Sequence, residues 1–76
     1  MFSHARLVSL REERGISRSD LHRALILRGL NRCRSLIDRW ETGRSEPSAT
    51  EVALLAAVLD VPIDRLFDLA LQPAHP

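Results

Sequence analysis

A short segment near the middle of the chain carries the residues with the most distinctive chemistry. Polar side chains recur there at three- and four-residue steps, at Arg34, Ser35, Asp38 and Arg39. A helix would place these four on one side and would turn Ile37 and Trp40 toward the opposite side. A helix fits the major groove of duplex DNA, and guanidinium and hydroxyl groups can contact base edges and phosphates. The spacing therefore predicts a solvent-facing polar surface backed by apolar residues.

Two residues of this segment allow more than one interpretation. Trp40 is the only tryptophan and could stack on a base, but its three-residue step from Ile37 favours a place in the core. Cys33 is the only cysteine, so an internal disulfide is excluded. A thiol near a helix N-terminus could act as a redox sensor, although an ordinary free thiol is the simpler interpretation.

Charge is distributed unevenly along the chain. Residues 1–44 hold ten arginines and five acidic residues, a net charge of +5, whereas residues 45–76 have a net charge of −4. The basic part could face a polyanion while the acidic part faces water or a partner. The alternative is that the arginines are solvated surface residues, since a chain without lysine can simply reflect coding bias.

A lone helix of this length is unstable in water, so other elements must support it. Helix start and stop signals predict an all-α protein with five helices, over residues 4–14, 18–28, 32–42, 49–59 and 63–71. Ser17 and Ser48 begin capping-box patterns, and Asn31 is the expected N-cap of the third helix. The expected core includes Leu7, Leu10, Leu21, Ala24, Leu25, Val52, Ala53, Leu55, Ala56, Leu59, Ile63, Leu66, Phe67 and Ala70. Residues 1–71 are expected to form one domain, with a mobile tail over residues 72–76.

The ordered set of short motifs resembles one known family. The motifs are Leu10-Arg-Glu-Glu-Arg-Gly-Ile-Ser17, Ile37-Asp-Arg-Trp-Glu-Thr-Gly43, Pro47-Ser48 and Leu55-Ala followed by Leu59-Asp-Val-Pro-Ile-Asp-Arg-Leu66. Together they are similar to the Cro/C1-type (Xre-like) helix-turn-helix family. The resemblance implies a compact five-helix bundle of the lambda-repressor-like kind. It also implies a homodimer that binds a roughly palindromic operator in double-stranded DNA and regulates transcription, most simply as a repressor.

The resemblance also implies roles for individual residues. It assigns base contacts to Arg34, Ser35 and Arg39, and contacts with the DNA backbone to Ser17, Arg18, Cys33 and Arg44. Arg11 and Glu41 match a pair that joins the first helix to the end of the third by a salt bridge, while Ile37 and Trp40 are structural.

The chain departs from the family pattern between its second and third helices. Twelve steps separate Leu25 from Ile37 where the family has seven, so five residues are inserted. The position of Gly29 suggests that about three of them lengthen the second helix and two lengthen the turn or the start of the third helix. The insertion could bring Arg28 and Arg32 near phosphates. His22 stands where the family usually has alanine, at the closest approach of the two helices.

The sequence also bears on functions other than DNA binding. Leu69 or Leu71 could remain exposed as a dimer surface. A protein-interaction module, such as an antitoxin-like or adaptor subunit, is the alternative function, motivated by the enlarged turn and the acidic last two helices. An enzyme is not expected, because so short a chain leaves scant volume for a pocket. No cofactor or metal site is expected, and without a signal peptide or membrane-spanning segment the sequence predicts a cytoplasmic protein.

Overall fold

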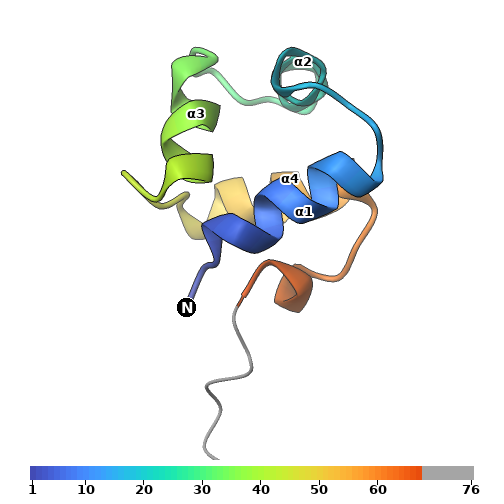
Figure 1. The fold of residues 1–76 in the computed structure, drawn as a ribbon. Coiled ribbons are helices and arrows are strands. Elements are labelled where there is room, and N and C mark those ends of the chain that lie inside the picture. Colours follow the sequence, from blue (N-terminus) through green and yellow to red (C-terminus); the bar gives the residue numbers. More distant parts are fainter. Residues whose placement is uncertain (68–76) are drawn as a thin grey trace, which may run out of the picture.

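The fold is entirely helical in the part of the chain that the structure describes. The computed structural model describes residues 1–67, which contain α1 (His4–Glu13), α2 (Arg18–Leu27), α3 (Ser35–Thr42), α4 (Ala49–Leu59) and the 3-10 turn η1 (Ile63–Leu66) (Figure 1). Residues 1–67 hold no strand, and one isolated bridge pairs Phe2 with Phe67. The predicted all-α class is confirmed. The predicted count of five α-helices is not matched, since residues 1–67 contain four α-helices and one 3-10 turn.

Local capping signals set the starts of α2 and α4. Ser17 Oγ accepts a hydrogen bond from the backbone N–H of Asp20, while the Asp20 carboxylate accepts one from the backbone N–H of Ser17. Ser48 and Glu51 make the same reciprocal pair at the start of α4. Both capping boxes were predicted, because each satisfies backbone donors that the first helical turn leaves free.

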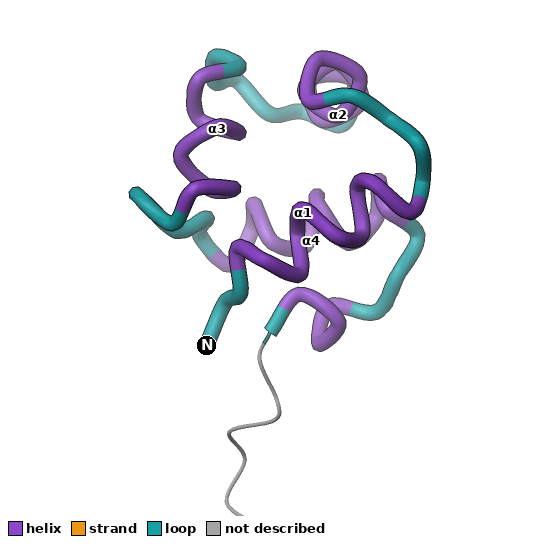
Figure 2. The backbone as a smooth tube through the Cα atoms, viewed as in Figure 1, coloured by secondary structure: helices purple, strands orange, loops and turns teal. Residues whose placement is uncertain are grey.

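The start of α3 differs from the prediction. Asn31 does not cap the helix, which begins at Ser35 after a seven-residue connection over residues 28–34. Helix-turn-helix turns are commonly only about three or four residues long, so most of the inserted residues lie in this connection and not in α2. Figure 2 shows the connection as a loop that joins the end of α2 to the top of α3.

Apolar side chains from every element meet in one core. α1 packs against α3 and η1, and α4 packs against α2 and η1. The buried apolar residues are Phe2, Leu7, Leu10, Leu21, Leu25, Leu30, Leu36, Ile37, Trp40, Val52, Leu55, Ala56, Leu59 and Leu66. Each fully buried leucine stabilises the fold by about 1.5–3 kcal/mol. The sequence interpretation missed Phe2, Leu30 and Leu36, and it wrongly placed Ala53, which is exposed, in the core.

The predicted fifth helix is replaced by η1 and an extended residue. Phe67 has φ −113° and ψ 150°, which ends the helical geometry after Leu66. Its ring meets that of Phe2 edge to face, with ring centroids 6.3 Å apart, and the backbone N–H of Ser3 donates to the Leu66 carbonyl at 2.9 Å. Ile63, expected in the core, is 49% exposed. The predicted core residue Ala70, the proposed dimer residues Leu69 and Leu71, and the predicted tail over residues 72–76 lie outside the described residues.

Candidate nucleic-acid interface

α3 divides its residues between a buried side and an exposed side. Its buried side chains are Leu36, Ile37, Trp40 and Glu41, and Trp40 is only 1% exposed. Ser35, Arg39 and Thr42 are exposed, and Asp38 is half-buried. This division follows from the helical repeat, because apolar residues that recur at three- and four-residue steps share one face. Figure 1 shows α3 beside α2, which is viewed nearly end-on, so the two axes are far from parallel.

A buried carboxylate fixes α3 to the elements behind it. The Glu41 side chain is 0% exposed. Arg11 Nε donates to Glu41 Oε2 at 2.6 Å, and Arg11 Nη2 donates to Glu41 Oε1 at 3.3 Å, so the contact is bidentate. Arg11 Nη1 also donates to the Ile16 carbonyl at 2.8 Å. One guanidinium therefore joins α1, the turn that leads to α2, and the end of α3. The structure thus brings together the pair that the resemblance implied.

Arg18 adds a second guanidinium to this cluster. Its Nε donates to Glu41 Oε1 at 2.8 Å, and its Nη1 donates to Asp38 Oδ1 at 3.1 Å. The hydrogen bond and the charge of Glu41 raise the pKa of Arg18 above its ordinary value, with a smaller contribution from Asp38. Arg18 was assigned to the DNA backbone by resemblance. In this structure it connects the first turn of α2 with α3, and its side chain remains 43% exposed.

Further contacts hold the residues just before α3. Arg34 Nη1 donates to the Ser19 hydroxyl at 2.9 Å, so the predicted base-contacting arginine rests against α2. The Cys33 sulfur lies 3.0 Å from the Ser35 hydroxyl. That side-chain hydrogen bond is the main cause that lowers the pKa of the exposed Cys33 thiol. Predicted contact residues therefore lie together at the start of α3.

Besides the contact of Arg34 with Ser19, the enlarged connection is attached to the body of the domain at three points. Leu30 is buried in the core. His22 Nε2 lies 2.7 Å from the Arg32 carbonyl, in a geometry for donating to it. Arg32 Nη1 forms an ion pair with Glu51 Oε2 at 3.2 Å. His22 and Glu51 lie 10 and 19 residues from Arg32 in the sequence, so no local signal could have identified them as its partners.

The predicted contact arginines are all exposed, and three of them have no side-chain hydrogen bond within residues 1–67. Arg28, Arg39 and Arg44 are exposed, and none of them forms an ion pair within residues 1–67. Ser17 is also exposed, but its hydroxyl already accepts the capping hydrogen bond of α2. Arg39 and Ser35 share the exposed side of α3, one turn apart. The exposed side of α3 and the segments at its two ends thus carry hydroxyl and guanidinium groups that a polyanion could contact.

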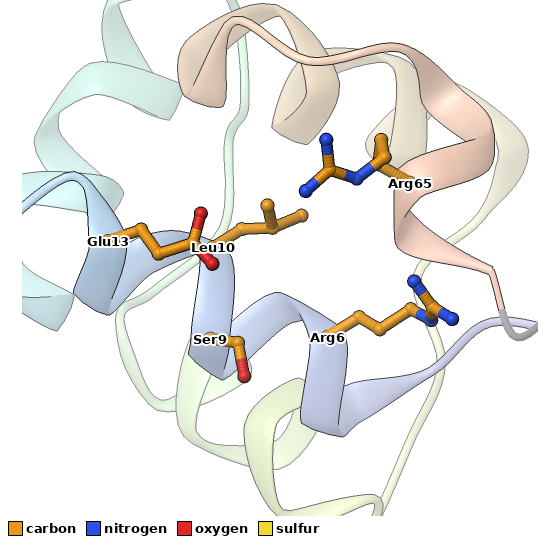
Figure 3. A pocket seen from close by; sticks show the side chains of 5 residues that line it. All are labelled: Arg6, Ser9, Leu10, Glu13 and Arg65. Carbon is orange, nitrogen blue, oxygen red and sulfur yellow. The ribbon is translucent and has the colours of Figure 1, made fainter.

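A small hollow lies elsewhere on the described part of the protein. It has a volume of about 190 Å³ and is lined by Arg6, Ser9, Leu10, Glu13 and Arg65 (Figure 3). All five come from α1 and η1, so the hollow includes no residue of α2 or α3. Pockets for small organic ligands are commonly about 300–1,000 Å³.

The described part of the chain, residues 1–67, has neither a candidate metal site nor a membrane-spanning helix. No group of three or more His, Cys, Asp or Glu side chains there is arranged to hold a metal ion. In the same part of the chain, no helix has the length and apolar character needed to cross a membrane.

Comparison with known families agrees with the arrangement of α2 and α3. The sequence model of the family described as "Helix-turn-helix domain" matches residues 5–69, which is most of the chain. The chain therefore belongs to this helix-turn-helix family, whose fold points to DNA binding, commonly in a regulatory role. No curated protein sequence and no solved structure matches the chain.

Proposed function

We propose that this protein is a sequence-specific regulator of transcription of the Cro/C1 (Xre-like) type, which binds double-stranded DNA as a homodimer and represses from a palindromic operator. The observation that carries the proposal is the attachment of α3. Trp40 and Glu41 hold it from behind, while Ser35 and Arg39 stay exposed on its other side. A helix held in this way can enter the major groove without paying the cost of ordering itself on contact.

Within this proposal, bases are contacted by Arg34, Ser35 and Arg39. Phosphates are contacted by Ser17, Arg18, Arg28, Arg32, Cys33 and Arg44. Two half-sites about one helical turn apart would raise affinity and selectivity, which is the reason for proposing a dimer. The proposal assigns no catalysis to the chain.

The experiment is the selection of bound fragments from randomised double-stranded DNA, followed by titration of the best fragment at several salt concentrations. We expect a palindromic consensus, and log affinity should fall with log salt at a slope of about −0.9 for each phosphate contact. Arg34→Ala should abolish specific binding while the protein stays folded. Arg6→Ala is the matched control, because it removes the same charge from α1 at the hollow. No enrichment of any sequence would show the proposal to be wrong.

A protein-interaction module remains the second candidate, and one observation favours it. Ile26 and Leu27, at the end of α2, are 42% and 83% exposed. Exposed apolar side chains beside an enlarged connection could contact a partner protein. A stable heteromeric complex that is lost in Leu27→Ser, together with no shift of DNA at low salt, would favour this function over the first.

A further inference from the structure

The edge of α3 contains a feature that DNA binding alone does not explain. Asp38 lies one turn after Arg34 and Ser35 and one turn before Thr42, and it is half-buried between the buried and the exposed side of α3. Its side chain is 42% exposed. α3 has two carboxylates, and the other, Glu41, is completely buried. A carboxylate at this position repels phosphates, so it lowers affinity for DNA of every sequence.

Arg18 compensates for part of this charge and orients the carboxylate. Its Nη1 donates to Asp38 Oδ1 at 3.1 Å, while its Nε is attached to the buried Glu41 at 2.8 Å. Because the same guanidinium is bound to the buried Glu41, its position is fixed. It therefore holds the Asp38 carboxylate at the edge of α3. Within residues 1–67, no hydrogen bond uses Asp38 Oδ2. One carboxylate oxygen is thus held by α2, and the other is free to accept a hydrogen bond.

The bases differ sharply in what they offer such an acceptor. In the major groove, cytosine presents the N4 amino donor, whereas guanine presents the acceptors O6 and N7, and thymine the acceptor O4. Adenine presents its N6 amino group beside the acceptor N7, which repels a carboxylate. A fixed carboxylate therefore favours cytosine by attraction and rejects guanine and thymine by repulsion.

We propose that Asp38 is a specificity-determining residue that accepts a hydrogen bond from the N4 amino group of a cytosine in the major groove. This inference rests on the proposed function, because it concerns the same helix. It adds a specific base preference to the site. It also explains why a carboxylate stands among the arginines of residues 1–44: the side chain lowers affinity for wrong sequences more than for the right one.

The test compares the wild type with Asp38→Asn, using selection from randomised duplexes and then competition between the best duplex and variants with one base pair changed. The wild type should require cytosine at one position of each half-site, with about a tenfold loss when thymine replaces it. Asparagine can donate as well as accept, so Asp38→Asn should reduce that discrimination to about twofold or less. Its affinity for unrelated DNA should rise.

Asp64→Asn is the matched control, because it removes the same charge from η1, away from α3. It should keep the cytosine requirement. The ratio between two duplexes is the deciding quantity, because both are bound by the same folded molecules and a loss of stability cancels. If Asp38→Asn keeps the wild-type preference, or if the selected sites hold no fixed cytosine, the inference is wrong and the proposed function stands. If the wild type selects no DNA sequence, both are wrong.

Discussion

Removing the buried carboxylate of α3 provides a severe test of how the helix is held. In Glu41→Ala, the guanidinium of Arg11, whose side chain is only 12% exposed, loses both of its contacts with the carboxylate. Breaking a buried ion pair by removing one partner costs about 3–5 kcal/mol. A domain of this size has a total stability of about 4–11 kcal/mol, so the change removes a large part of it.

Urea unfolding followed by the fluorescence of Trp40 suits this measurement, because Trp40 is the only tryptophan and lies in the core beside Glu41. With a slope of about 1–1.5 kcal/mol per molar urea, the midpoint should fall by at least about 2 M. Glu41→Gln keeps the shape and one acceptor but loses the charge, so its urea midpoint should lie between those of the wild type and Glu41→Ala.

Glu12→Ala is the control, because Glu12 is an exposed carboxylate of α1 that forms no ion pair within residues 1–67. Its unfolding free energy should change by no more than about 0.5 kcal/mol. A Glu41→Ala midpoint within about 0.5 M of the wild type would refute the reasoning, since it would mean that the buried pair contributes nothing to the position of α3.

Two further predictions concern the ends of α3. Gly43→Ala should destabilise the domain more than Gly15→Ala. Both glycines have positive φ, 80° at Gly43 and 69° at Gly15. A Cβ at Gly43 would lie 3.1 Å from His4 Nδ1, whereas a Cβ at Gly15 would meet nothing within 4 Å. Equal losses of unfolding free energy would show that the His4 contact is unimportant. At the other end, the Ser35 hydroxyl lowers the pKa of the Cys33 thiol, so more thiolate is present at a given pH. The rate of alkylation plotted against pH should therefore have a lower midpoint in the wild type than in Ser35→Ala, and coincident midpoints would contradict this cause.

Local signals predicted the elements whose ends are determined locally. The capping serines at Ser17 and Ser48 and the turn at Gly43 use atoms within a few residues, so the sequence alone predicts α2, the end of α3 and α4 well. The start of α3 was placed too early, because Arg32 is held by His22 and Glu51 and this keeps residues 31–34 out of the helix.

The C-terminal part and the candidate site show the same difference between features set by local signals and features set by long-range contacts. The predicted fifth helix does not continue through Phe67, because this residue pairs with Phe2. That contact joins opposite ends of the described chain. The spacing of Arg34, Ser35 and Arg39 could be read along one helix. The contacts of Arg18 with Asp38 and Glu41 span 20 and 23 residues, so its role in holding α3 could not be deduced from spacing.

The pairing of Phe2 with Phe67 creates a short mechanical route through the molecule. η1 is a single turn and depends on its neighbours for order, and one of these neighbours is the segment that leads into α1. Two residues after Phe2, the His4 ring lies against Gly43, where α3 ends. A displacement of Phe67 would therefore reach the C-terminal end of α3 through two aromatic rings and an imidazole, a path that uses the edge of the core at Phe2.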